Sequence, residues 1–199
     1  PPGKKISRQE ILFLADIAVR PTSTTVARYK RLNLSRRRGN AIRLSLSAAG
    51  IIGAVSIPIR SGQVVLYQLT DSGRGVCEYL EIDPGPALQQ SLQHRYWVRQ
   101  TKHYFEKQGY DLIVEHPIKG NGAIDLFARK NDEKIAIEVE TGKSDIIANL
   151  KKSKDAGFDK IILIATSPIA INACQRAVKK VDTEKGPVIE QLNWLDISG

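Results

Sequence analysis

The stretch that decides the fold of this chain is Gly122-Ala-Ile-Asp125-Leu-Phe-Ala-Arg-Lys-Asn-Asp-Glu-Lys134-Ile-Ala-Ile-Glu138-Val-Glu140-Thr-Gly-Lys143-Ser-Asp145. Two apolar runs on either side of a polar turn indicate a β-hairpin, and the final Ser-Asp suits the start of a helix. Because side chains alternate along a strand, Glu138 and Glu140 lie on one face, and strand pairing brings Asp125 beside them. Carboxylates this close repel each other unless a cation lies among them. The stretch therefore predicts a site for a hard cation.

The rest of the second half alternates between helices and strands. We expect a helix from residue 87 or 92 to 108, strands over 110–116 and 134–141, a helix over 144–156, a strand over 160–165, a helix over 168–181 and a strand over 188–194. The apolar run Lys160-Ile-Ile-Leu-Ile-Ala165 is typical of a central strand that is buried on both faces. This order predicts an α/β (α+β) domain in which helices cover a mixed sheet.

The first eighty residues carry the signals of several helices and a hairpin. Ser7 and Glu10 form a capping box before a first helix, and further helices are expected over 24–32, with Val26 facing inward, and 38–49. The runs 51–59 and 64–69 flank a turn at Arg60 and indicate a β-hairpin, which a short helix over 70–80 follows. Asp83-Pro-Gly-Pro86 breaks regular structure, so we expect domains over 1–83 and 84–199.

The net charge of +9 is unevenly distributed along the chain. Residues 1–60 carry twelve Lys and Arg against two acidic residues, whereas residues 91–199 carry seventeen against fifteen. This imbalance predicts a polyanion-binding module joined to an electrically balanced one.

Composition bounds the class of protein. With 42% hydrophobic and 26% charged residues, disorder is not indicated, and no apolar run reaches the ~18 to 20 residues of a membrane span. The cysteines, Cys77 and Cys174, have no metal-binding spacing, which favours buried thiols of an intracellular, cytoplasmic protein over a disulfide. The chain lacks methionine and begins Pro-Pro-Gly, so we expect a fragment or a processed terminus.

Three helices followed by a hairpin resemble the winged-helix family of helix-turn-helix domains over residues 7–82. The resemblance implies that the third helix enters the major groove of DNA and that the hairpin contacts the phosphate backbone. The DNA-binding residues would be Arg36, Arg37, Arg38, Asn40 and Arg43 around the third helix and Arg60 on the hairpin. A solvated basic face, or a surface that binds protein, would use the same residues.

Residues 92–166 resemble the PD-(D/E)XK (restriction-endonuclease-like) nucleases, whose core is αβββαβ and whose motif is an acidic residue followed by acid-x-Lys. Here the motif is Asp125 and Glu138-Val-Glu140, with Glu140 in the place of the usual lysine, which Lys143 or Lys152 could replace. Nuclease-like domains with such a Glu-x-Glu motif are appended to prokaryotic conjugation or DNA-translocating ATPases and to mobile elements, which makes an ATPase or translocase an expected partner.

The resemblance implies Mg²⁺- or Mn²⁺-dependent hydrolysis of DNA. Asp125, Glu138 and the carbonyl of Val139 would bind the metal, and Glu140 would bind a second metal or orient water. Glu115 is either an outer ligand or a solvated strand end. A homodimer would allow both strands to be cut.

The same acidic residues could have purely structural roles. Asp125 could cap a turn, and Glu138 and Glu140 could form surface ion pairs with Lys134, Lys143 or Lys152. Three hypotheses follow: an endonuclease domain with a DNA-binding winged helix, a catalytically inactive DNA-binding module of the same fold, and a protein-interaction adaptor. The histidines His94, His103 and His116 have no metal-binding spacing and are expected to be ordinary helix or loop residues.

Overall fold

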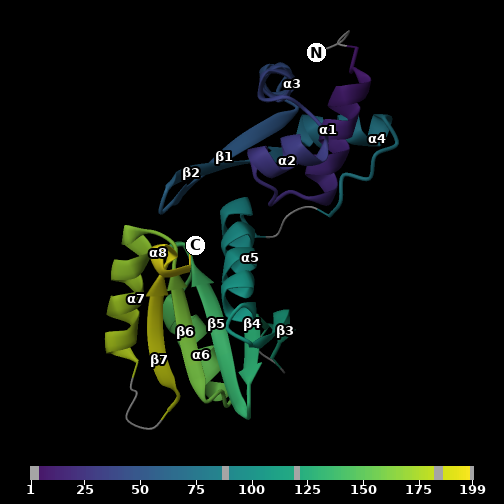
Figure 1. The fold of residues 1–199 in the computed structure, drawn as a ribbon. Coiled ribbons are helices and arrows are strands. Elements are labelled where there is room, and N and C mark those ends of the chain that lie inside the picture. Colours follow the sequence, from purple (N-terminus) through teal and green to yellow (C-terminus); the bar gives the residue numbers. More distant parts are fainter. Residues whose placement is uncertain (1–4, 87–89, 119–121, 182–185, 198–199) are drawn as a thin grey trace. The chain divides into compact units, whose positions relative to one another are not determined.

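The computed structural model describes residues 5–86, 90–118, 122–181 and 186–197 of the chain. It forms two compact units, a first unit, Pro1–Leu92, and a second unit, Gln93–Gly199, each with its own sheet (Figure 1). The segment after the expected boundary at Asp83 belongs to the first unit. Arg74 holds it there by donating hydrogen bonds to the carbonyl oxygens of Pro84 (3.3 Å) and Gly85 (2.5 Å).

The first unit combines helices with a two-stranded antiparallel hairpin. Its elements are α1 (Arg8–Val19), α2 (Thr25–Arg31), α3 (Arg36–Ala48), β1 (Ile52–Ile59), β2 (Gly62–Leu69) and α4 (Asp71–Tyr79). The capping box of Ser7 and Glu10 is confirmed at the start of α1. Helix α3 begins at Arg36, two residues earlier than predicted, because the Ser35 hydroxyl accepts the Arg38 N–H and caps the helix there.

Two glycines allow close approach within the first unit. A Cβ on Gly39 of α3 would lie 2.5 Å from the Tyr29 ring, and one on Gly73 of α4 would lie 2.0 Å from the Ile51 carbonyl oxygen. These contacts set the packing of α2 on α3 and of α4 on the start of the hairpin. The prediction that Val26 faces inward was wrong, since its side chain is 78% exposed while Tyr29 is buried.

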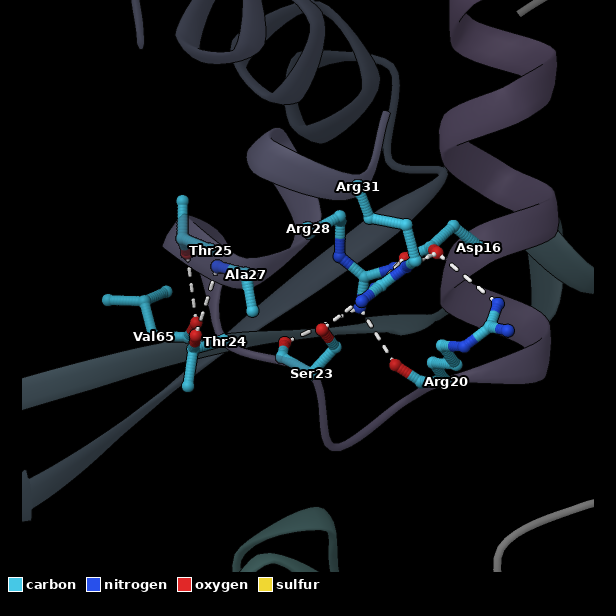
Figure 2. A network of polar contacts seen from close by, with 9 residues as sticks. All are labelled: Asp16, Arg20, Ser23, Thr24, Thr25, Ala27, Arg28, Arg31 and Val65. Carbon is cyan, nitrogen blue, oxygen red and sulfur yellow. Dashed lines mark hydrogen bonds and ion pairs between the residues drawn. The ribbon is translucent and has the colours of Figure 1, made fainter. Parts of the chain in front are cut away.

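A buried ion network joins α1 to α2 (Figure 2). The carboxylate of Asp16 accepts hydrogen bonds from the fully buried Arg28 and from Arg31, whose Nε and Nη2 lie 2.6 and 2.8 Å from its two oxygens. Arg20 Nη1 lies 3.7 Å from the same carboxylate, and the Arg20 carbonyl accepts a hydrogen bond from Arg28. Burial lowers the pKa of Arg28 to about 10, although Asp16 raises it. Asp16 thus balances several arginines at once.

The second unit contains a five-stranded mixed sheet of order β3-β4-β5-β6-β7. Its elements are α5 (Leu92–Glu106), β3 (Asp111–Pro117), β4 (Ala123–Lys130), β5 (Glu133–Glu140), α6 (Ile146–Asp155), β6 (Lys160–Ala165), α7 (Pro168–Lys180), β7 (Val188–Asn193) and α8 (Trp194–Ile197). Strands β3, β4 and β5 pair antiparallel, whereas β5, β6 and β7 pair parallel. The predicted α/β class with a mixed sheet is confirmed.

Helices α6 and α7 cover the sheet face that carries the two glutamates of β5. Their apolar residues, among them Leu150 and Cys174, form one core with the alternate residues of β5 and β6. On the opposite face, Ile137 and Ile162 are also buried. The prediction that β6 is buried on both faces is therefore confirmed.

Strand β3 lies at one edge of this sheet and has an irregular residue at its centre. The pairing with β4 passes from Val114–Leu126 to His116–Ile124 and omits Glu115. Glu115 has a φ of 52°, in the left-handed region that non-glycine residues rarely adopt, and it is exposed. The regular ladder is therefore interrupted at this position.

Candidate functional site

Asp125 lies where β4 and β5 separate. The pairing of the two strands reaches Leu126–Ile137 and includes no pair at Asp125. The Asp125 carboxylate instead accepts a hydrogen bond from the Val139 N–H through Oδ2 (2.8 Å), and its own N–H lies 3.4 Å from Oε2 of Glu138. The two acids are therefore neighbours on adjacent strands, as the sequence predicted.

Glu138 is almost completely buried, with 3% of its surface exposed, and it contacts a lysine. Lys152 of α6 places Nζ 3.0 Å from Oε1 of Glu138 and donates a hydrogen bond to the Ala123 carbonyl (2.6 Å). Burial, reinforced by the negative charge of Asp125, raises the pKa of Glu138 to about 7, although Lys152 lowers it. A buried carboxyl group with so high a pKa is found at functional sites and also in structural ion pairs.

The third acid, Glu140, is engaged by residues of the following loop and helix. It is 1% exposed, and its two carboxylate oxygens accept hydrogen bonds from the Ser144 hydroxyl and from Nδ2 of Asn149 (3.0 Å). Its carbonyl oxygen accepts from both the N–H and the hydroxyl of Thr166. Glu140 shares the sheet face with Glu138, but its contacts fix the connection from β5 to α6.

Lys152 and Lys143 differ in position. The prediction that Lys152 and Asn149 look back at the carboxylates from one face of α6 is confirmed by their contacts with Glu138 and Glu140. Lys143 is exposed and contacts no acidic group within the part of the chain that the structure describes. Glu115 is likewise exposed and forms no hydrogen bond with Asp125 or Glu138.

His94 is a site residue that the sequence analysis missed. It lies in the first turn of α5, and its Nε2 is 2.9 Å from Oδ2 of Asp125. Burial lowers the pKa of His94, but the hydrogen bond with Asp125 and the nearby negative charges more than offset this, and the net pKa is raised. No sequence signal could have found it, because the contact joins residues thirty-one positions apart.

The donor groups fit a Mg²⁺-like ion in part. In the described ranges, no group of three or more His, Cys, Asp or Glu side chains is arranged to hold a metal ion. Mg²⁺, however, usually binds one or two protein carboxylates and takes its other ligands from water and substrate phosphates. Asp125 and Glu138 provide such a pair, and Oδ1 of Asp125 accepts no hydrogen bond from any described residue. Glu140 lies outside this pair, since its oxygens accept hydrogen bonds from Ser144 and Asn149, whereas Glu138 contacts the backbone N–H of Asp125 directly.

The predicted DNA-binding residues divide into exposed and engaged groups. Arg36, Arg37 and Arg38 are exposed in the first turn of α3, and Arg60 is exposed in the turn of the hairpin. Arg38 Nε also donates a hydrogen bond to Gln9 of α1 (2.5 Å).

Asn40 and Arg43 are partly buried and contact each other. Oδ1 of Asn40 accepts hydrogen bonds from the Tyr29 hydroxyl (3.1 Å) and from Nε of Arg43 (3.2 Å). The structure therefore leaves the side-chain oxygen of Asn40 occupied, and its contacts stabilise the packing of α3 on α2.

No family model, no curated protein and no solved structure matches this chain. In the described ranges, no helix is long and apolar enough to cross a membrane.

Proposed function

We propose that the second unit is a metal-dependent deoxyribonuclease domain and that the first unit binds DNA. The observation that carries this proposal is the meeting of Asp125, Glu138 and Lys152, which come from β4, β5 and α6. Two acids and a lysine at the separation of two strands match the motif of the PD-(D/E)XK nucleases, with the lysine supplied by the helix. The order of strands and helices in the second unit supports the same proposal.

Each residue has a part in this chemistry. Asp125 and Glu138, with the Val139 carbonyl, would hold Mg²⁺ or Mn²⁺, which supplies Lewis-acid activation of the phosphate and of a water molecule. Lys152 Nζ lies beside Glu138, where an ammonium group can neutralise the charge that develops on a phosphate oxygen. His94 holds the Asp125 carboxylate in place through Oδ2 and leaves Oδ1 for a ligand.

The role of Glu140 is to fix the helix that carries Lys152. Its hydrogen bonds to Ser144 and Asn149 fix the start of α6, and Lys152 lies on this helix one turn after Asn149. We therefore assign Glu140 to the support of Lys152 rather than to a second metal ion.

The first unit supports DNA binding by its element order and its charge. Three helices and a hairpin are arranged in the order of a winged helix, and exposed arginines begin α3. Phosphate contacts of such arginines give binding that weakens steeply with salt.

A plasmid-cleavage assay with Mn²⁺ or Mg²⁺ tests the nuclease proposal. We expect the unaltered protein to nick DNA, and Asp125→Asn and Glu138→Gln to abolish nicking. Asp155→Asn, at the exposed end of α6, removes a carboxylate outside the site and should leave activity unchanged. Cleavage that survives Asp125→Asn, or no cleavage by the unaltered protein, would reject the proposal.

A second candidate function is a catalytically inactive DNA-binding module. The observation that favours it is that the acids already have cationic neighbours, Lys152 at Glu138 and His94 at Asp125. Calorimetry with Mn²⁺ in the presence of DNA separates the two candidates. Binding that disappears in Asp125→Asn supports the nuclease, whereas no binding supports the inactive module.

A further inference from the structure

Helix α3 has one face that packs inward and one that remains outside. Gly39, Ile42 and Leu46 follow helical spacing and are buried, and Gly39 lies against the Tyr29 ring. The opposite stripe is exposed along its whole length. It consists of Arg37, Ala41, Leu44 and Ala48, at spacings of four, three and four residues.

This outward face is apolar at its centre. Leu44 is 56% exposed, and the residues one turn before and after it are alanines. A single exposed leucine is ordinary on a protein surface. Here, however, its neighbours along the stripe are alanines, so the stripe is apolar from Ala41 to Ala48.

Positive charge surrounds the start of this apolar stripe. Arg36, Arg37 and Arg38 occupy the first turn of α3, and no acidic residue lies in that turn to neutralise them. By contrast, Arg20, Arg28 and Arg31 share the carboxylate of Asp16, so their charge is partly balanced within the fold. The arginines at the helix start, which have no acidic residue beside them in that turn, favour a polyanion as the occupant of this face over a protein partner.

We propose that Leu44 and Ala41 contact thymine methyl groups in the major groove of duplex DNA. This inference rests on the proposed DNA-binding function of the first unit. The thymine methyl is the apolar group that base edges present in the major groove, and leucine and alanine side chains can pack against it. Arg37, at the head of the same stripe, would bind guanine through its O6 and N7.

This arrangement of side chains along α3 predicts which bases the protein prefers and their order along the duplex. Thymines would lie opposite the middle of α3, and a guanine would lie opposite its first turn. Arg36 and Arg38, which flank the stripe, would contact phosphates and add affinity without sequence preference.

The test compares an A·T-rich duplex with the same duplex in which deoxyuridine replaces every thymine. Affinities are measured by fluorescence anisotropy in EDTA, so that no metal-dependent cleavage takes place. We expect the unaltered protein to bind the thymine duplex about fourfold more tightly for each methyl group contacted, because each buried methyl contributes about 0.8 kcal/mol. Leu44→Ala should lose most of this difference and bind the deoxyuridine duplex nearly as well as before.

Leu12→Ala is the matched control. Leu12 is 50% exposed on α1, outside the stripe, and its removal should leave the preference for thymine intact. Circular dichroism of both variants checks that the helices are retained, and Leu44→Gln, which keeps side-chain length but not apolarity, repeats the test.

The outcomes separate this inference from the proposal on which it rests. Salt-sensitive binding of equal strength to both duplexes would overturn the thymine contact and leave DNA binding in place. An equal loss on both duplexes in Leu44→Ala would also overturn it. Absence of salt-sensitive binding to either duplex would instead reject DNA binding by the first unit.

Discussion

The buried Glu138 carboxyl predicts that the stability of the second unit depends on pH in a defined way. Burial and the charge of Asp125 raise the pKa of this carboxyl from 4.5 to about 7. Between these values the folded protein retains a proton that the unfolded chain has lost. The free energy of unfolding must therefore fall as pH rises through this window.

The magnitude follows from the size of the shift. One pKa unit corresponds to about 1.4 kcal/mol, so the shift of Glu138 costs about 3 kcal/mol of stability when pH rises from about 4.5 to about 8. Glu138→Gln removes the titrating group and keeps the shape of the side chain. We expect its free energy of unfolding, relative to that of the unaltered protein, to increase by about this amount over the same range.

Urea unfolding followed by tryptophan fluorescence provides the assay. Trp97 and Trp194 both belong to the second unit, so the signal reports this unit alone, and EDTA keeps metal ions away. His94, whose raised pKa also makes stability fall with rising pH, is present in both proteins, so most of its contribution cancels in the difference. The charge of Glu138 helps to raise the pKa of His94, and its loss in the variant adds to the measured difference. Glu106→Gln, at an exposed glutamate of α5, is the control. A constant difference between the Glu138→Gln variant and the unaltered protein at every pH would refute the reasoning.

Three further predictions concern packing and backbone conformation. Asp16→Asn should destabilise the first unit by about 3 to 5 kcal/mol, because Arg28 stays buried without its counter-charge. Urea unfolding followed by circular dichroism measures this loss, and a loss below about 1 kcal/mol would contradict the prediction. Gly73→Ala should cost more than about 2 kcal/mol by the same assay, because its Cβ would meet the Ile51 carbonyl oxygen. Gly75→Ala in the same helix has open space around the new Cβ and should stabilise the first unit by up to about 1 kcal/mol. Equal effects of the two substitutions would refute the clash at Gly73. Glu115→Gly should raise the free energy of unfolding of the second unit by about 1 kcal/mol, because glycine adopts the left-handed conformation without strain. Urea unfolding followed by tryptophan fluorescence measures this change. A decrease would show that the Glu115 side chain contributes a stabilising contact.

Local signals in the sequence were sufficient to predict much of the fold. The predicted capping residues Ser7 and Asp145 lie directly before α1 and α6, where their side chains accept free N–H groups. The alternation along β5 correctly put Glu138 and Glu140 on one face, and the apolar run of β6 correctly indicated a central strand. Each of these features depends on residues only a few positions apart.

The candidate site was predictable only in part, because side-chain partners depend on tertiary contacts. Period-two geometry brought the three acids to one region but could not show that Ser144 and Asn149 engage Glu140. The contact of His94 with Asp125 depends on how α5 meets the sheet, which no local pattern specifies.

The charge count of the first unit was limited for the same reason. It treated all its arginines alike, but Arg28 is fully buried with Asp16 (Figure 2). A count of charged residues takes no account of burial, and burial decides which of these arginines can contact a polyanion.

The irregular residue of β3 has a consequence for how this protein behaves at high concentration. An edge strand with exposed Ile113 and Val114 would offer unpaired backbone groups to another copy and could nucleate aggregation. The left-handed Glu115 adds a charge near the centre of that strand and interrupts its pairing with β4, and Pro117 at its end lacks an amide hydrogen. Together these two residues disfavour pairing of β3 with an edge strand of another copy.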